Sequence, residues 1–165
     1  MRHATVFSRC CIAVLLPVGL TLLAPPAADS ASTSDVAVVV NPTVPVGEIS
    51  FTELRRVFLG ERQFWSSSLR ISLLLHAPVA RERDVLLKTV YEMSEAQLRQ
   101  HWIGKVFRAE APSAPQTFFS DEEIVQALAA IPGSIAAVDA ARLPRGLRVL
   151  RIDGHLPGEP GYRLR

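Results

Sequence analysis

Residues 36–60 read VAVVVNPTVPVGEISFTELRRVFLG, and this stretch decides the fold class. Its opening, residues 36–41, is a run of apolar, mostly β-branched side chains, which is typical of a strand buried on both faces in a parallel sheet. Prolines and a glycine then interrupt the run. A helix is predicted over 51–59, because Ser50 and Glu53 have the spacing of a capping box and apolar residues follow at helical intervals.

The same alternation of strands and helices continues along the chain. Further strands are predicted at 70–76, 134–139 and 147–152, and further helices over a stretch that opens at Pro78, over 95–106 and over 121–130. The resulting order β-α-β-α-α-α-β-β predicts an α/β domain, in which helices flank a mixed and mostly parallel sheet.

Residues 1–30 have the three parts of a secretory signal peptide. A basic start is followed by the uncharged run CCIAVLLPVGLTLLA at 10–24, and then by small and polar residues. This run is short of the roughly 20 residues that a membrane-spanning helix needs. We therefore expect a chain that is periplasmic or secreted after cleavage, without stable membrane insertion; an uncleaved anchor helix is the alternative.

Cleavage of that segment would change the chemistry open to the protein. Cys10 and Cys11 both lie in it, so the domain predicted at 31–152 has no thiol for a disulfide, a metal or a nucleophile. The remaining chain carries 16 basic and 15 acidic residues, a balance that gives no indication of a nucleic-acid partner. The glycine- and proline-rich tail at 153–165 is predicted to be flexible.

The sequence holds none of the common enzyme signatures. Its nine glycines are scattered, and it contains neither a GxSxG elbow nor an HExxH pair. The three histidines beyond the signal segment lie far apart in the sequence. We therefore expect no catalytic residue, no metal and no cofactor; a hydrolase whose triad assembles only in space is the remaining alternative.

The turn after the predicted strand at 70–76 is the candidate ligand site. Ligands of open α/β sheets lie beyond the carboxyl ends of strands, where helix N-termini offer free N–H groups. His76 ends the strand, and Arg81 and Arg83 follow in the turn and the next helix, where two guanidinium groups would suit an oxyanion. We predict these three as ligand-binding residues. The alternative is that both arginines are solvated and pair with neighbouring carboxylates.

The aromatic residues are a second candidate. Phe64 and Trp65 fall in a predicted loop and are candidates for an interaction surface with a periplasmic or membrane protein. Trp102 and Phe107 continue a helical stripe, so we expect both in the core. Four arginines between 142 and 151 are expected at a solvated sheet edge or, in an interaction module, at the partner.

Several segments together resemble the substrate-binding proteins of phosphate transporters. Residues 38–65 have a strand ending in Asn-Pro, a helix ending in Val-Phe-Leu-Gly, and then a basic residue and a tryptophan. Residues 94–107 resemble the family's helix that ends in Trp and Phe, and 120–138 resemble its late helix, Pro-Gly turn and strand. The similarity spans 36–152.

The resemblance implies a periplasmic-binding-protein-like domain of the second structural type, whose full members hold an oxyanion between two lobes. About 135 residues remain after processing, which corresponds to a single lobe. The family's Ser-Gly-Thr type of loop is Ala-Pro-Val-Ala at 77–80, which leaves Arg81 or Arg83 as anion contacts. We expect either an exported, non-enzymatic lobe that binds phosphate or another small oxyanion, or a protein-interaction or sensing module without that ligand.

Overall fold

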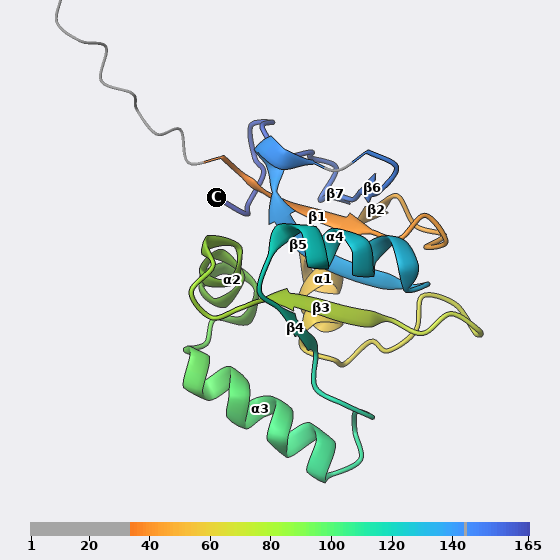
Figure 1. Cartoon of the computed structure of the whole chain (residues 1–165), viewed down its shortest axis with the longest axis vertical. Coiled ribbons are helices and arrows are strands. Elements are labelled where there is room, and N and C mark those ends of the chain that lie inside the picture. Colours follow the sequence, from red (N-terminus) through yellow and green to blue (C-terminus); the bar gives the residue numbers. More distant parts are fainter. Residues whose placement is uncertain (1–33, 144) are drawn as a thin grey trace, which may run out of the picture. The chain divides into compact units, whose positions relative to one another are not determined.

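The computed structural model describes residues 34–143 and 145–165, so the predicted signal peptide lies outside the described residues. The strands are β1 (Val36–Val40), β2 (Glu48–Ile49), β3 (Ser72–His76), β4 (Gln116–Phe118), β5 (Ser134–Asp139), β6 (Arg148–Val149) and β7 (Arg151–Ile152). Five of them form one sheet in the order β4-β3-β5-β1-β6, and β2 pairs with β7 beside it (Figure 1).

The sheet is mixed, as predicted. The strand β3 runs parallel to both β4 and β5, whereas β1 runs antiparallel to both β5 and β6. The buried valine run of β1 was expected to indicate parallel neighbours, and this expectation was wrong. Such a run reports burial of both strand faces, and helices on both sides of a sheet bury an antiparallel strand equally well.

Helices cover both faces of the sheet. They are α1 (Phe51–Phe58), α2 (Arg81–Leu86) with its continuation as the π-helix η1 (Leu87–Tyr91), α3 (Glu95–Phe107), α4 (Asp121–Ala130) and the short 3₁₀ turn η2 (Ala140–Arg142). The hydroxyls of Ser50, Ser94 and Ser120 each accept a hydrogen bond from the backbone three residues on, as predicted. The helix expected to open at Pro78 begins instead at Arg81, without a side-chain cap.

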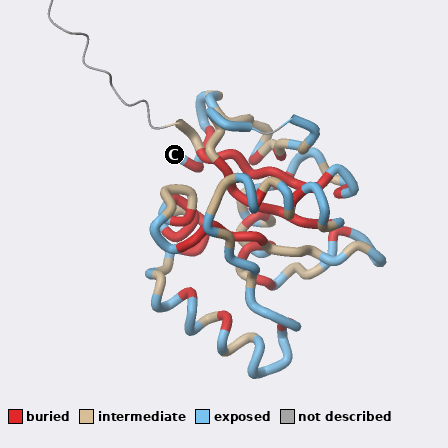
Figure 2. Tube along the Cα trace, in the orientation of Figure 1, coloured by how far each residue is buried: buried red, intermediate tan, exposed pale blue. Residues whose placement is uncertain are grey.

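Two apolar clusters form the core, one on each face of the sheet. The side chains of Val36, Val38 and Val40 pack with α1, η1 and the first half of α3, and Ala37 and Val39 pack with α4. Figure 2 shows this burial as continuous red along the central strands. None of the helices in the described ranges combines the length and the apolar character needed to span a bilayer.

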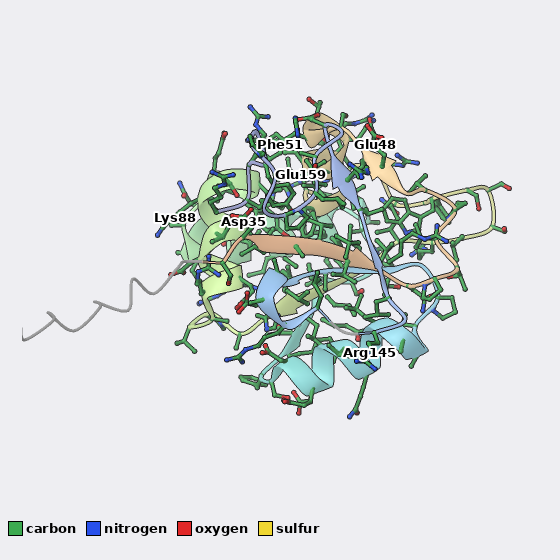
Figure 3. All side chains as sticks on the ribbon, turned by 90° about the horizontal axis from the view of Figure 1, so that it is seen from above. Asp35, Glu48, Phe51, Lys88, Arg145 and Glu159 are labelled. Atoms are coloured by element: carbon green, nitrogen blue, oxygen red, sulfur yellow. The ribbon has the colours of Figure 1, made fainter. Side chains whose placement is uncertain are left out.

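The C-terminal segment 153–165 packs against the rest of the described domain. The hydroxyl of Tyr162 donates to the Val36 carbonyl (2.7 Å), and the Val36 amide donates to the Leu164 carbonyl (2.8 Å). Both Tyr162 and Leu164 are buried. Figure 3 shows Glu159 of this segment on the side of the domain that carries Phe51. The segment expected to be flexible thus has two buried side chains and two hydrogen bonds to Val36.

Candidate functional site

The carboxyl edge of the parallel strands, where the ligand site was predicted, holds His76 beneath the N-terminus of α4. The residue is only 4% exposed. Its Nδ1 lies 3.8 Å from the Asp121 Oδ1, and its Nε2 is buried without a hydrogen-bond partner among the described residues. No hydroxyl therefore completes a catalytic triad at this imidazole in the described part of the chain.

Arg83 is buried, and each of its three guanidinium nitrogens donates a hydrogen bond to the protein itself. Its Nε and Nη2 donate to the two carboxylate oxygens of Glu95, at 3.1 and 2.8 Å, and its Nη1 donates to the His76 carbonyl at 3.2 Å. The guanidinium thus ties the end of β3 to the start of α3. Arg83 pairs with a carboxylate, as the alternative expected, but it is buried rather than solvated, and its partner lies on the next helix rather than beside it.

Arg81 turns toward the β5 end of the same edge. Its Nη2 donates to the carbonyl of Ser34, whose hydroxyl donates to the Asp139 carboxylate. Burial would raise the pKa of Asp139, but the hydrogen bonds from Ser34 and the Ala141 amide, with Arg81 and Arg142 nearby, outweigh it and lower that pKa. An anion bound beside Arg81 would therefore face an ionised carboxylate.

Ion pairs also occupy the neighbouring part of this edge. Arg142 Nη1 lies 3.3 Å from the Asp121 Oδ2. His76, Arg81 and Arg83 thus lie at one edge of the sheet, and each basic group there has an acidic group nearby. The described residues also contain no cluster of three or more metal-ligating side chains.

The two aromatic residues predicted as an interaction surface, in the loop at 61–69, differ in burial. Trp65 is only 6% exposed, and its Nε1 donates to the Gly133 carbonyl at 2.9 Å. The expectation of Trp65 as an interaction residue is therefore corrected, because its indole ties the loop to the start of β5. Phe64 does remain exposed, with the Arg70 guanidinium 5.1 Å from its ring centre.

The second half of α3 presents apolar side chains to solvent. Trp102 is buried as expected, but Phe107 is 89% exposed, and Ile103 and Val106 are exposed too. The expectation of Phe107 in the core was wrong because α3 extends past the sheet (Figure 1). A stripe at helical spacing predicts an apolar face and does not say how much of that face is covered.

These side chains line a groove between α3 and the sheet, which we call the α3 groove. It encloses about 670 Å³. Its apolar wall consists of Leu75, Leu98, Trp102, Ile103, Val106 and Phe107. Thr117 of β4 borders it, and the exposed Arg99 lies at its rim. Sequence reasoning missed this groove because it predicted no strand between the helices at 95–106 and 121–130, where β4 lies.

Comparison of the whole fold with solved structures finds phosphate-binding proteins among the structures it resembles. A protein from Clostridium perfringens, described as a phosphate ABC transporter substrate-binding protein with bound phosphate, has a TM-score of 0.59 at 12% identity, over 73% of this chain and 46% of that one. An ABC-type phosphate transport receptor from Vibrio cholerae has a TM-score of 0.59 at 10% identity, over 75% and 48%. PstS from Borrelia burgdorferi has a TM-score of 0.57 at 14% identity, over 75% and 49%.

These likenesses confirm the resemblance at the level of the fold. The chain spans about half the length of the structures it matches, so the described domain has the fold of a single lobe of such proteins. No family model matches the sequence, and no curated protein does either.

Proposed function

We propose that this chain is an exported, non-enzymatic binding lobe that acts through protein contact at the α3 groove rather than by holding a small anion. The observation that carries the proposal is the engagement of Arg83, whose three guanidinium nitrogens all donate to protein oxygens. The basic residue best placed to bind an oxyanion is thereby already paired within the protein. The export rests on the signal-peptide pattern of residues 1–30.

The α3 groove supports the second half of the proposal. Exposed apolar side chains that gather in one place, rather than scatter, mark surfaces where proteins bind one another. Ile103, Val106 and Phe107 gather in this way on one helix and beside one hollow. Aromatic residues such as Phe107 contribute large contact areas to interfaces.

A second candidate is the capture of a small oxyanion such as phosphate at His76. The specific observation is the buried Nε2 without a described partner, on a ring whose Nδ1 lies 3.8 Å from the Asp121 carboxylate at the start of α4. An imidazole N–H and the first amides of α4 would both be donors to an anion. The relative from Clostridium perfringens holds phosphate, which lends weight to that choice of ligand.

A thermal-shift experiment separates the two candidates. Melting of the full chain is followed with phosphate, with sulfate, and with sodium chloride at equal ionic strength. If the chain does not hold a small anion, neither oxyanion raises the melting temperature beyond the effect of chloride. A ligand present at 100 times its dissociation constant would add about 2.7 kcal/mol, so a real site is readily detected. A rise with phosphate that His76→Ala abolishes would establish the second candidate instead.

The groove itself is probed with the dye 8-anilinonaphthalene-1-sulfonate, whose fluorescence increases on apolar surfaces. We expect the native chain to enhance this fluorescence, and Phe107→Ala to remove most of the enhancement. The matched control is Phe64→Ala, which deletes an exposed ring on a different surface. If both variants give the same signal as the unmodified chain, the α3 groove is not an accessible apolar site.

A further inference from the structure

The strand β4 ends the sheet with one edge free of any described strand. It pairs only with β3, in the register Leu75↔Thr117 and His76↔Phe118. The Phe118 carbonyl accepts from the Ala77 amide, so the main chain of Phe118 faces β3. Main-chain groups of successive residues point to opposite sides of a strand. The N–H and C=O of Thr117 therefore point outward from the sheet.

Thr117 also lies between two hollows. One is the α3 groove, and the other is a hollow of about 590 Å³ on the opposite face of the sheet, which we call the α4 groove. The α4 groove is lined by Phe118, Phe119, Ala127, Ala130 and Ile131, among others. The ring of Phe119 is 83% exposed. An unpaired strand edge is thus flanked by a largely apolar hollow on each face, and the α4 groove also contains the side chains of Glu123 and Gln126.

This arrangement suits an added β-strand. Successive side chains of a strand point to opposite faces of a sheet. A strand laid along β4 would hydrogen-bond to the Thr117 main chain and place alternate side chains into the α3 groove and the α4 groove. Recognition by strand addition takes its affinity from main-chain bonds and its specificity from such pockets.

The charged residues of the α3 groove indicate which charge a bound segment would carry. Arg99 is exposed at the α3 groove, and it belongs to none of the ion pairs formed by the described residues. The other charges of the groove, Arg83 and Glu95, neutralise each other. The α3 side of an added strand therefore meets one uncompensated positive charge, which favours a carboxylate on that strand.

A second copy of this chain fits the edge less well. Antiparallel pairing of two β4 strands would direct Thr117 of one copy toward the α3 groove of the other, because Thr117 lies on the same face as Leu75. A threonine is small and partly polar. It would leave the hollow beside Trp102 and Phe107 largely unfilled.

We propose that β4 is a docking edge for an extended segment of a different polypeptide, apolar at alternate positions and carrying a carboxylate that reaches Arg99. The proposal rests on the proposed function, because the α3 groove is one of the two pockets that it uses. It goes beyond that function by naming the conformation, the side-chain pattern and the charge of the partner segment.

The test uses the full chain and a fluorescein-labelled peptide, Pro-Thr-Glu-Thr-Leu-Thr-Leu-Ser-Pro, whose terminal prolines prevent self-pairing. Its glutamate and both leucines point to the same face of an extended strand, so that face can meet Arg99 and the α3 groove together. Fluorescence anisotropy should show saturable binding below 1 mM. Thr117→Pro removes the outward N–H and leaves the bonds to β3 intact, so we expect at least a tenfold loss of affinity. The matched control, Thr117→Val, keeps the N–H and should bind as the unmodified chain does. Arg99→Gln should weaken binding about two- to fivefold.

Amide exchange gives a second measurement that does not depend on the folding of a variant. In the unmodified chain, the Thr117 amide should exchange more slowly when the peptide is added. Absence of binding at 1 mM, or binding without protection of this amide, would overturn strand addition. If dye binding at the α3 groove persists in that case, the proposed function stands alone. If the dye is also insensitive to Phe107→Ala, both fail. Self-association that Thr117→Pro abolishes would identify a second copy as the occupant and overturn our choice of partner.

Discussion

Arg83→Met is the substitution that most directly tests the internal role of Arg83. Loss of one partner from a buried ion pair costs about 3–5 kcal/mol. The side chain of Glu95 is 29% exposed, so water can solvate its carboxylate in the variant. We therefore expect the loss of the ion pair to cost only about 2 kcal/mol. The unpaired His76 carbonyl adds about 1 kcal/mol. Methionine retains most of the apolar packing, so the total loss is about 3 kcal/mol.

Urea unfolding at pH 7, followed by far-ultraviolet circular dichroism, measures this loss as a fall in the midpoint of about 1–2 M. The matched control is Arg99→Met, which removes an exposed arginine of the same groove and should change the free energy of unfolding by less than about 0.5 kcal/mol. Adding Glu95→Gln to Arg83→Met should recover part of the loss, because the carboxylate then no longer lacks its counter-charge. If Arg83→Met costs no more than Arg99→Met, Arg83 is not a structural cation, and the case against an anion at this edge collapses.

The remaining predictions concern hydroxyl and carboxyl groups elsewhere in the core and at the edge. Tyr91→Phe should raise the free energy of unfolding by about 1 kcal/mol, because this buried hydroxyl has no described partner. Tyr162→Phe should lower it by about 1 kcal/mol, because that hydroxyl donates to the Val36 carbonyl at 2.7 Å; equal effects of the two substitutions would contradict both assignments. Asp139→Asn should destabilise the chain at pH 7, because the pKa of Asp139 is lowered by its bonds, among them that from Ser34. A carboxyl group whose pKa is lowered by folding stabilises the chain above its ordinary pKa near 3.8, and that stabilisation is lost as the pH falls through the lowered pKa. The urea midpoints of the two proteins should therefore converge as the pH is lowered below about 4.

Local rules in the sequence were sufficient for much of the fold. The serines at 50, 94 and 120 predicted three helix N-termini, because capping depends on residues within one turn of each other. The strand at 134–139 was predicted with its bounds, because a Pro-Gly turn marks its start and an aspartate follows its five apolar or small residues. Signals of this kind depend only on neighbours in the chain.

The features that sequence reasoning missed all depend on distant partners. The strand β4 has three residues and no apolar period of its own, so only its pairing with β3 makes it a strand. The pairing of Arg83 with Glu95 crosses from one helix to the next, beyond the reach of an argument from adjacent charges. The exposure of Phe107 follows from the length of sheet beneath α3, which helical periodicity does not contain.

For a lobe that binds without a second lobe, apolar contacts contribute more binding free energy than ionic contacts do. An anion held between two lobes loses water on both sides, and each of its ionic contacts is strengthened by that low-polarity surrounding. An anion on the carboxyl edge of the described lobe would keep water on one side, and exposed ion pairs contribute only about 0–1 kcal/mol. A leucine that fills a groove gains about 1.5–3 kcal/mol whether or not salt is present. The neutralisation of Arg83 by Glu95 and the exposed apolar side chain of Phe107 therefore both favour the proposed contact at the α3 groove over an anion at the carboxyl edge.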